Sequence, residues 1–192
     1  MIANLPTPEQ RYGQRTGALQ ILILGGSQGA VALNELLPQA LALLPANERP
    51  IIRHQTGKKQ VELTQQRYHD LGLSADVQPF IGDMAEAYGW ADLVICRSGA
   101  LTVSELAAAG VASVLVPYPF AVDDHQTANA RYLSDEQAAV LCPQGTITPE
   151  SLVSTLKPLL SRPKLLQMAT VARKLAQPEA TAIVAGFCTR SE

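Results

Sequence analysis

The stretch DLVICRSGALTVSELAAAG, residues 92–110, passes from a strand-like run to a helix-like run with almost no loop between them. Residues 92–96 form a short aliphatic run, which is typical of a buried strand in a parallel sheet. Residues 100–109 then predict a helix that ends at Gly110. A strand followed directly by a helix is the repeating unit of α/β proteins, so this stretch predicts the fold class.

The same alternation extends through the rest of the chain. It predicts an α/β fold with a Rossmann-like, doubly wound parallel sheet of about six strands. The predicted strands are residues 19–24, 50–54, 76–81, 92–96, 112–116 and 138–141. The predicted helices are residues 30–44, 58–71, 84–88, 100–109, 149–160, 163–176 and 179–189, with one more that follows a loop at residues 123–125 and runs through residue 132.

The chain divides into three parts by composition. Residues 1–17 are polar and rich in Pro and Gly, and we predict that they are a linker. Residues 18–176 are predicted to form one Rossmann-like domain, and residues 177–192 a C-terminal helix. A single domain fits the length of 192 residues.

Composition and charge exclude several classes of protein. The chain is 47% hydrophobic and 17% charged, which is typical of a soluble globular protein. The net charge of -2 gives no electrostatic basis for binding nucleic acid. No apolar stretch reaches the roughly 18 residues that a membrane span needs, and residues 1–18 are not typical of a signal peptide.

The cysteines and histidines do not form a metal-binding pattern. The three cysteines are far apart and lack CxxC spacing, and the three histidines are equally scattered. We therefore expect reduced thiols in a cytoplasmic protein, no metal site and no cofactor. These residues are Cys96, Cys142, Cys188, His54, His69 and His125.

Ligands of doubly wound sheets bind at the carboxyl ends of the strands. The segments that would meet there are the strand-to-helix junctions at residues 25–30, 81–84, 97–105 and 117–129. Each carries polar groups or glycines, and each also has a purely structural interpretation.

The first junction, LGGSQGA at residues 24–30, suits a phosphate. Its glycines allow close approach of the backbone, the following helix start attracts anions, and Ser27 adds a hydroxyl. The alternative is a plain turn with Ser27 as the helix N-cap. The segment is neither GxGxxG nor the phosphate loop of ATPases, which argues against a dinucleotide or ATP.

The third junction, residues 97–105, is a candidate for both phosphate and ribose. The amides of Ala100, Leu101 and Thr102 would lie unpaired at a helix start, and Glu105 one turn later could accept two hydrogen bonds from a ribose diol. The alternative is that Ser98 or Thr102 caps the helix and that Glu105 favours its dipole.

The second junction, FIGDM at residues 80–84, could read a pyrimidine through backbone N–H and C=O groups. The alternative there is a short turn with Asp83 as N-cap.

The fourth junction carries His125, Gln126 and Asn129 at a helix start, and amide and imidazole groups suit sugar hydroxyls. Its alternative has Asp123 or Asp124 as a cap and His125 as an ordinary exposed histidine.

Four motifs in these junctions are long and distinctive, and the similarity they carry runs from about residue 2 to the end of the chain. The sequence resembles the C-terminal domain of the MurG family, glycosyltransferase family 28, whose bacterial members add GlcNAc to lipid I to form lipid II in peptidoglycan synthesis. The motifs are GGSQGA at residues 25–30, FIGDM at residues 80–84, ADLVICRSGALTVSELAAAG at residues 91–110 and VPYPFAVDDHQTANA at residues 116–130.

The resemblance implies the C-terminal half of a GT-B glycosyltransferase that binds the donor UDP-GlcNAc and works with inversion and without a metal at the donor. Ser27 would contact the diphosphate, the backbone of Ile81 the uracil, and Glu105 the ribose. Gln126 and His125 would bind the GlcNAc hydroxyls. The full set of substrate-binding residues that it implies is Ser27, Ile81, Ala100, Leu101, Thr102, Val103, Ser104, Glu105, His125 and Gln126.

The resemblance also implies that this chain is half of an enzyme. Residues 1–17 match the interdomain linker, and the helix at residues 177–192 would pack toward the N-terminal domain. That missing domain would hold the catalytic base, the site for lipid I and the surface that meets the cytoplasmic side of the inner membrane. We therefore expect no catalytic residue in this chain, a soluble cytoplasmic fragment, and no transfer without the other domain.

Other functions remain open at this stage. The chain could be the subunit of a split UDP-GlcNAc transferase that docks on a membrane subunit, or a nucleotide-sugar binding module without catalysis. A GT-B-fold epimerase acting on UDP-GlcNAc would also need two domains. A nicotinamide dehydrogenase fits least, because the glycine fingerprint is absent.

Overall fold

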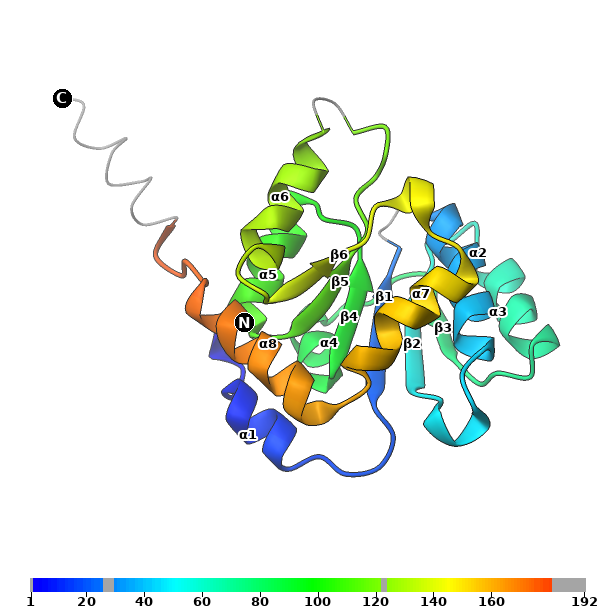
Figure 1. The fold of residues 1–192 in the computed structure, drawn as a ribbon, viewed down its shortest axis with the longest axis horizontal. Helices are drawn as coiled ribbons and strands as arrows, with labels where there is room; N and C mark the ends of the chain where they lie inside the picture. Colours follow the sequence, from blue (N-terminus) through cyan, green and yellow to red (C-terminus); the bar gives the residue numbers. More distant parts are fainter. Residues whose placement is uncertain (1, 26–29, 122–123, 181–192) are drawn as a thin grey trace.

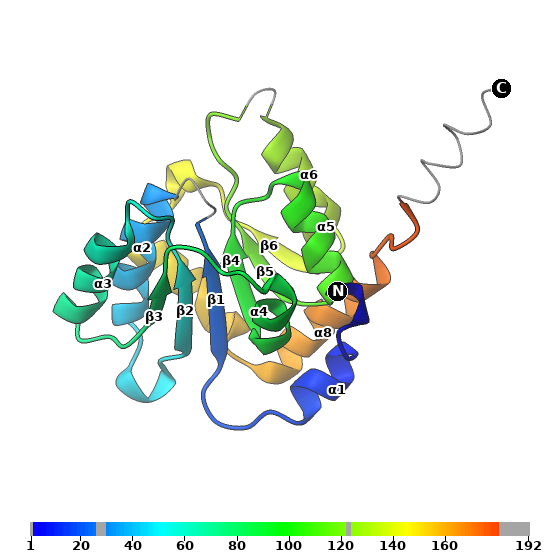
Figure 2. The same ribbon diagram turned by 180° about the vertical axis from the view of Figure 1, so that it is seen from behind.

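The computed structural model describes residues 2–25, 30–121 and 124–180. A six-stranded parallel sheet in the order β3-β2-β1-β4-β5-β6 lies between two layers of helices (Figures 1 and 2). The predicted doubly wound α/β fold is confirmed. The strands are β1 Gln20–Leu24, β2 Ile51–Gln55, β3 Asp76–Gln78, β4 Leu93–Cys96, β5 Ala112–Leu115 and β6 Ala139–Leu141.

The helices of the described residues include the predicted ones, in the predicted order, together with four short ones that were not predicted. They are η1 Ile2–Asn4, α1 Pro8–Gly13, α2 Val31–Ala42, η2 Ala46–Glu48, α3 Val61–Asp70, α4 Met84–Trp90, α5 Ala100–Ala109, α6 His125–Ser134, η4 Gln144–Thr146, α7 Pro149–Leu156, η5 Lys157–Leu159 and α8 Arg162–Lys174. The predicted helix at residues 149–160 is thus α7 followed by a 3-10 turn, because Pro158 lacks an N–H group. Most of the predicted helix at residues 179–189 lies outside the described residues.

The central strand β1 contributes side chains to both hydrophobic layers. Ile21 and Ile23 point to the side covered by α2, α7 and α8, whereas Leu22 and Leu24 point to the side covered by α4, α5 and α6. β1 pairs with β2 on one edge and with β4 on the other. This burial on both faces explains why the strand is continuously aliphatic rather than alternating.

The strand predicted at residues 76–81 ends early. β3 stops at Gln78, because Pro79 follows and cannot donate to the ladder. Ile81 therefore lies in the loop beyond the strand, where its side chain is buried against the layer of α4 and α5.

The N-terminal segment, predicted as a linker, contains helical structure that is anchored to the domain. A capping box of Thr7 and Gln10 begins α1. Arg11, which is buried, donates to the carbonyls of Tyr88, Ala109 and Gly110 at 3.1, 2.6 and 2.5 Å. Its role as an interdomain connection stays a prediction.

A buried carboxylate ties this segment to the amino ends of the strands. Asp92, fully buried before β4, accepts from Arg15 at 2.5 Å and from Arg162 at 3.2 Å. It also accepts from the backbone N–H of Gln20 at 2.9 Å. The hydroxyl of Tyr12 donates to the Asp92 carbonyl at 2.6 Å. One residue thus joins α1, β1, β4 and α8.

Gly110 packs where α5 ends against α1 and α8, and it gives a test of this contact. Its φ is 60°, and a Cβ there would lie 2.8 Å from the Cβ of Arg173 and 3.0 Å from Cγ of Pro8. Gly72 has a similar φ of 63° with nothing within 4 Å. Both substitutions to alanine incur left-handed strain of about 1–2 kcal/mol. Gly110→Ala should cost about 1–3 kcal/mol more, because only there is the packing overfilled.

Urea unfolding of the two glycine variants checks this expectation. Equal losses of unfolding free energy for Gly110→Ala and Gly72→Ala would contradict the tight contact between α5, α1 and α8.

Candidate functional site

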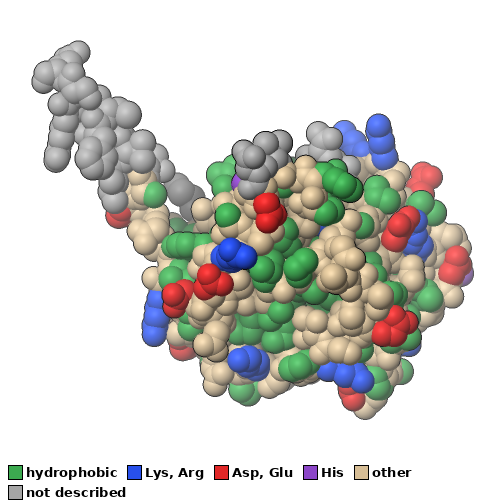
Figure 3. All heavy atoms as spheres, turned by 45° about the horizontal axis from the view of Figure 1, so that its top comes forward, with side chains coloured by type: hydrophobic (Ala, Val, Ile, Leu, Met, Phe, Trp, Pro, Cys, Tyr) green, Lys and Arg blue, Asp and Glu red, His purple; other side chains and the backbone are tan. Residues whose placement is uncertain are grey.

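The candidate site lies at the carboxyl edge of the sheet, where the strand order reverses between β1 and β4. This is the position at which doubly wound sheets bind ligands. In Figure 3, which brings the top of Figure 1 forward, hydrophobic side chains gather across this part of the surface. Phe80, Leu101 and Phe120 each follow a strand there, and 60%, 81% and 78% of their surfaces are exposed.

The first turn of α5 offers backbone amides without a side-chain cap. Gly99 is the N-cap, and no side chain makes a capping hydrogen bond to this helix. The structural alternative, in which Ser98 or Thr102 caps α5, is therefore wrong. Orphan amides at a helix start attract anions, together with the helix dipole.

Ser98 serves a different purpose. It is fully buried, and its hydroxyl donates to the carbonyl of Gln126 at 2.7 Å. The side-chain amide of Asn129 donates back to the Ser98 carbonyl at 3.1 Å. These bonds fasten the start of α6 to the junction between β4 and α5, so two of the predicted junctions form one unit.

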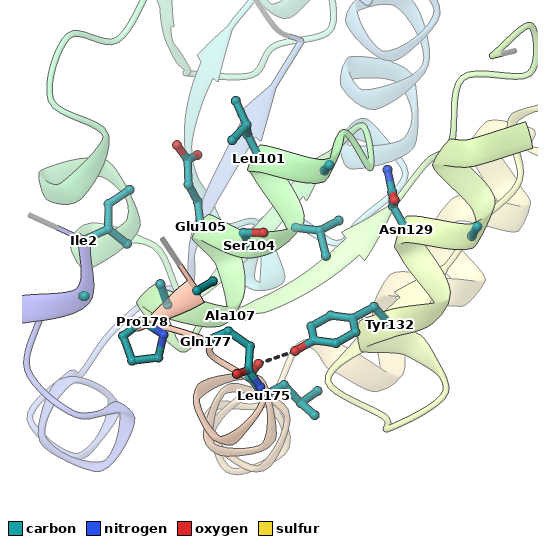
Figure 4. Close-up of a pocket in the computed structure, with 16 residues that line it drawn as sticks. Ile2, Leu101, Ser104, Glu105, Ala107, Asn129, Tyr132, Leu175, Gln177 and Pro178 are labelled. Carbon is teal, nitrogen blue, oxygen red and sulfur yellow. Dashed lines mark hydrogen bonds between the residues drawn. The ribbon is translucent and has the colours of Figure 1, made fainter. Parts of the chain in front are cut away.

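Glu105 lies one turn into α5 with a fixed orientation. Its Oε2 accepts from the hydroxyl of Tyr88 at 2.9 Å. Burial, with Cys96 and Glu105 nearby, raises the pKa of Tyr88 well above its ordinary value, so the phenol stays a donor. Figure 4 shows Glu105 projecting from α5 beside Leu101. Among the described residues, no hydrogen bond is made to the other carboxylate oxygen of Glu105.

Two cavities hold most of the predicted residues. One of about 760 Å³ lies along α5 and α6, and the hydroxyl of Tyr132 donates to the Leu175 carbonyl at its wall (Figure 4). The predicted residues that line it are Ala100, Leu101, Val103, Ser104 and Glu105.

The other cavity, of about 540 Å³, lies at the reversal between β1 and β4. Gln126 is the predicted residue that lines it, and its Oε1 accepts from the backbone N–H of Tyr118 at 3.0 Å. Its other lining residues are Gly25, Ala30, Val31, Ala32, Arg97, Tyr118 and Gln144.

Four predicted residues lie elsewhere. Thr102 is half-buried in the first turn of α5, and exposed His125 begins α6. Ile81 is buried beyond β3, and neither cavity includes these three side chains. Ser27 lies outside the described residues.

The two alternatives with aspartates as caps have different outcomes. Asp83 caps α4, since its Oδ1 accepts from the N–H of Glu86 at 2.9 Å, so that alternative is confirmed. Asp124 stands at the N-cap of α6 with φ 50° but makes no capping bond, and its carboxylate accepts from Thr127 instead. Asp123 lies outside the described residues.

Sequence analysis missed Arg97, the first residue after β4. Its guanidinium donates to the carbonyls of Val116 and Pro117 at 3.0 and 3.1 Å and to Oε1 of Gln144 at 2.5 Å. It lies 5.6 Å from the ring centroid of Tyr118. Within the described part of the chain, no carboxylate pairs with it. Burial lowers the pKa of Arg97, yet an arginine stays charged, so the cavity carries a positive charge.

The only signal for Arg97 in the sequence was its position, since it is a cation directly after a buried strand at the edge of the sheet where ligands bind.

In residues 2–25, 30–121 and 124–180, no three His, Cys, Asp or Glu side chains gather so as to hold a metal ion. Over those same residues, no helix is both long and apolar enough to cross a membrane.

A serine pair tests the junction between α5 and α6. Ser98→Ala should lower the free energy of unfolding by about 0.5–1.5 kcal/mol, because the hydrogen bond from the buried Ser98 hydroxyl to the carbonyl of Gln126 is lost. The matched control is Ser113→Ala, where the buried hydroxyl has no hydrogen-bond partner among the described residues, so stability should hardly change. Denaturant unfolding measures both, and equal effects would contradict the linking role of Ser98.

Comparison with known proteins gives one family. Residues 20–183 match the family described as the glycosyltransferase family 28 C-terminal domain. One curated relative is the "UDP-N-acetylglucosamine--N-acetylmuramyl-(pentapeptide) pyrophosphoryl-undecaprenol N-acetylglucosamine transferase" of Marinobacter nauticus, which is 55% identical over 188 residues. The protein of the same name from Nitrosomonas europaea is 58% identical over 187 residues. Each match covers 97% of this chain and 52% of the relative.

Solved structures agree with this match. The crystal structure of MurG from Acinetobacter baumannii superposes with a TM-score of 0.93 at 50% identity, over 99% of this chain and 55% of that one. A UDP-GlcNAc 2-epimerase from Neisseria meningitidis superposes with a TM-score of 0.58 at 11% identity, which shows the fold alone. The chain thus spans about half the length of the curated relatives it matches.

Proposed function

Since the chain belongs to the family of glycosyltransferase family 28 C-terminal domains, we propose that it binds the donor UDP-GlcNAc at the carboxyl edge of its sheet. The observation that carries this proposal is the first turn of α5, where uncapped amides stand one helical turn before a carboxylate held by Tyr88. Amides at a helix start suit a diphosphate, and the free oxygen of Glu105 suits a ribose diol.

The proposed contacts follow the order of the donor. The backbone of Ile81 would meet the uracil, Glu105 the ribose, and Ser27 the diphosphate. Gln126 and His125 would bind hydroxyls of GlcNAc. The remaining contacts would come from the start of α5, at Ala100, Leu101, Thr102, Val103 and Ser104.

Arg97 supports the same function. It brings a positive charge without a carboxylate partner into the cavity between β1 and β4, close to where a diphosphate at α5 would lie. Fixed donors and dipoles aimed at developing charge lower the barrier of a reaction in which a charged group leaves. Arg97 and the amides of α5 would therefore stabilise the departing UDP.

The curated relatives are named for transfer of N-acetylglucosamine to N-acetylmuramyl-(pentapeptide) pyrophosphoryl-undecaprenol. We propose that this chain supplies the donor half of such an inverting reaction, in which an acceptor hydroxyl attacks the anomeric carbon while UDP leaves. Lipid I, the catalytic base and a peripheral contact with the cytoplasmic side of the inner membrane would then involve parts of the protein outside these 192 residues.

Calorimetric titration with UDP-GlcNAc tests the proposal, with UDP-GalNAc, UDP and ADP as control ligands. Glu105→Ala should weaken binding of UDP-GlcNAc and UDP by about 1.5–3 kcal/mol, roughly ten- to hundredfold in Kd, because hydrogen bonds to a charged group are lost. The control Glu136→Ala changes an exposed acid before β6, at the opposite edge, and should bind as the parent does. Equal affinity for ADP and UDP, or no binding by a folded chain, would contradict the proposal.

Arg97 gives a separate test of the phosphate contact. Arg97→Gln should weaken binding of UDP while leaving binding of uridine almost unchanged, because the lost charge faces only the phosphates. Arg131→Gln, which removes an exposed arginine from the last turn of α6, is the matched control. A similar loss for uridine would show that Arg97 shapes the whole pocket rather than binding the phosphates.

A further inference from the structure

A chain of buried hydrogen bonds lies beneath the first turn of α2. The side chain of Asn34 donates through Nδ2 to the carbonyl of Thr56 at 3.1 Å. Its Oδ1 lies 3.0 Å from Nε2 of His54, and Nδ1 of His54 lies 3.0 Å from the hydroxyl of Tyr68. Asn34 and His54 are fully buried and Tyr68 almost so. The chain thus connects α2, β2 and α3.

The direction of each hydrogen bond follows from the one at Thr56. A carbonyl accepts, so the Asn34 amide directs its nitrogen to Thr56 and its oxygen to His54. The imidazole must then donate from Nε2, which leaves Nδ1 to accept from the phenol of Tyr68. This arrangement requires neutral His54. Burial lowers the pKa of His54 to about 3, which is consistent with it.

The network touches Gly25 and Ala30, the described residues at either end of the segment that leads from β1 to α2. The backbone N–H of Gly25 donates to the carbonyl of Gln55 at 2.8 Å. A Cβ on Gly25 would lie 2.9 Å from that carbonyl oxygen and 3.2 Å from Oδ1 of Asn34. The N–H of Asn34 donates to the carbonyl of Ala30 at 2.9 Å. Asn34 therefore lies against Gly25 and is hydrogen-bonded to Ala30, the two described ends of the segment between β1 and α2.

These two ends are part of the cavity between β1 and β4. Its wall on this side consists of Gly25, Ala30, Val31 and Ala32. Among the described residues, no side chain caps the start of α2. The other buried positions of α2 are apolar and pack along its length, mainly Leu33, Leu37 and Leu41. At the end of α2 that faces the cavity, the polar network supplies hydrogen bonds, which fix orientation, whereas the other buried contacts of α2 are apolar.

We propose that Asn34, oriented by His54 and Tyr68, is a positioning residue that holds the first turn of α2 at the distance from β1 and β2 that the donor's phosphates require. This inference rests on the proposed function, since it names what sets the shape of that site. A buried polar network is costly unless every member is satisfied, and this one is satisfied throughout. An apolar core here would hold the helix but would not fix the register of its first turn.

The test compares network variants with a packing control in the same helix. Asn34→Leu removes both hydrogen bonds of the amide at similar volume, and Tyr68→Phe removes only the hydroxyl. His54→Leu removes the donor to Asn34, whereas His54→Gln retains an N–H that can reach it. Leu41→Ala creates a cavity at the far end of α2 and leaves the network intact.

Two readouts separate positioning from plain stability. Calorimetry measures Kd for UDP-GlcNAc on samples that are fully folded. Hydrogen exchange follows the amides of residues 34–36, which make the first hydrogen bonds within α2. We expect Asn34→Leu and His54→Leu to raise Kd and speed this exchange by at least about tenfold, because each variant loses two buried hydrogen bonds of the network. His54→Gln should recover most of both, and Leu41→Ala should change neither.

Each outcome decides the matter. Unchanged Kd in Asn34→Leu and His54→Leu, or an equal loss in Leu41→Ala, would overturn the inference. If the parent chain does not bind UDP-GlcNAc at all, the proposed function fails instead. In that case hydrogen exchange alone tests the role of the network. Faster exchange confined to residues 34–36 in Asn34→Leu and His54→Leu would support that role, and unchanged exchange would overturn it.

Discussion

The carboxylate of Asp92 is the contact on which the arrangement of this domain depends. It is buried at the amino end of β4, where two arginines and a backbone N–H satisfy its oxygens. Removal of a partner from such a site typically costs roughly 3–5 kcal/mol, because a charge is left buried and unpaired. Because α1, β1, β4 and α8 are joined at the amino ends of the strands, these elements are held together without relying on contacts at the carboxyl ends. The carboxyl edge can therefore consist largely of strand-to-helix junctions and helix starts.

The strand β4 also determines the arrangement of the carboxyl edge of the sheet. After Cys96 only three residues separate β4 from α5, so the start of α5 has little freedom relative to the sheet. Ser98 uses its hydroxyl to hold α6, and this leaves the amides of α5 without a side-chain cap. A helix start that a neighbouring residue could have capped is thus kept open. Sites built on rigid elements hold their geometry better than sites built on long loops.

Sequence patterns predicted the fold well, because buried parallel strands are aliphatic runs and prolines and glycines end most elements. They failed for α1, where Arg11 looks like a surface residue and is buried only because three distant carbonyls receive its guanidinium. In the site, a serine before a helix predicts a cap equally well whether it caps or bonds elsewhere. Ser98 bonds to α6 instead of capping α5 because the fold places the carbonyl of Gln126 within reach of its hydroxyl. Arg97 was missed for a similar reason, since its partners come from the segment directly after β5 and from η4.

The place of β1 in the sheet has a consequence for how the chain folds during synthesis. β1 precedes the other five strands of this sheet in the chain, yet it lies in the middle, and its second edge stays unpaired until β4 has left the ribosome. The partners of Arg11 are also distant in the chain, at Tyr88 before β4 and at Ala109 and Gly110 after it. Pairings so distant in sequence form slowly and leave apolar edges open meanwhile. Within this domain, the helix α1 that precedes the sheet in the chain is therefore among the last elements to be fixed in place.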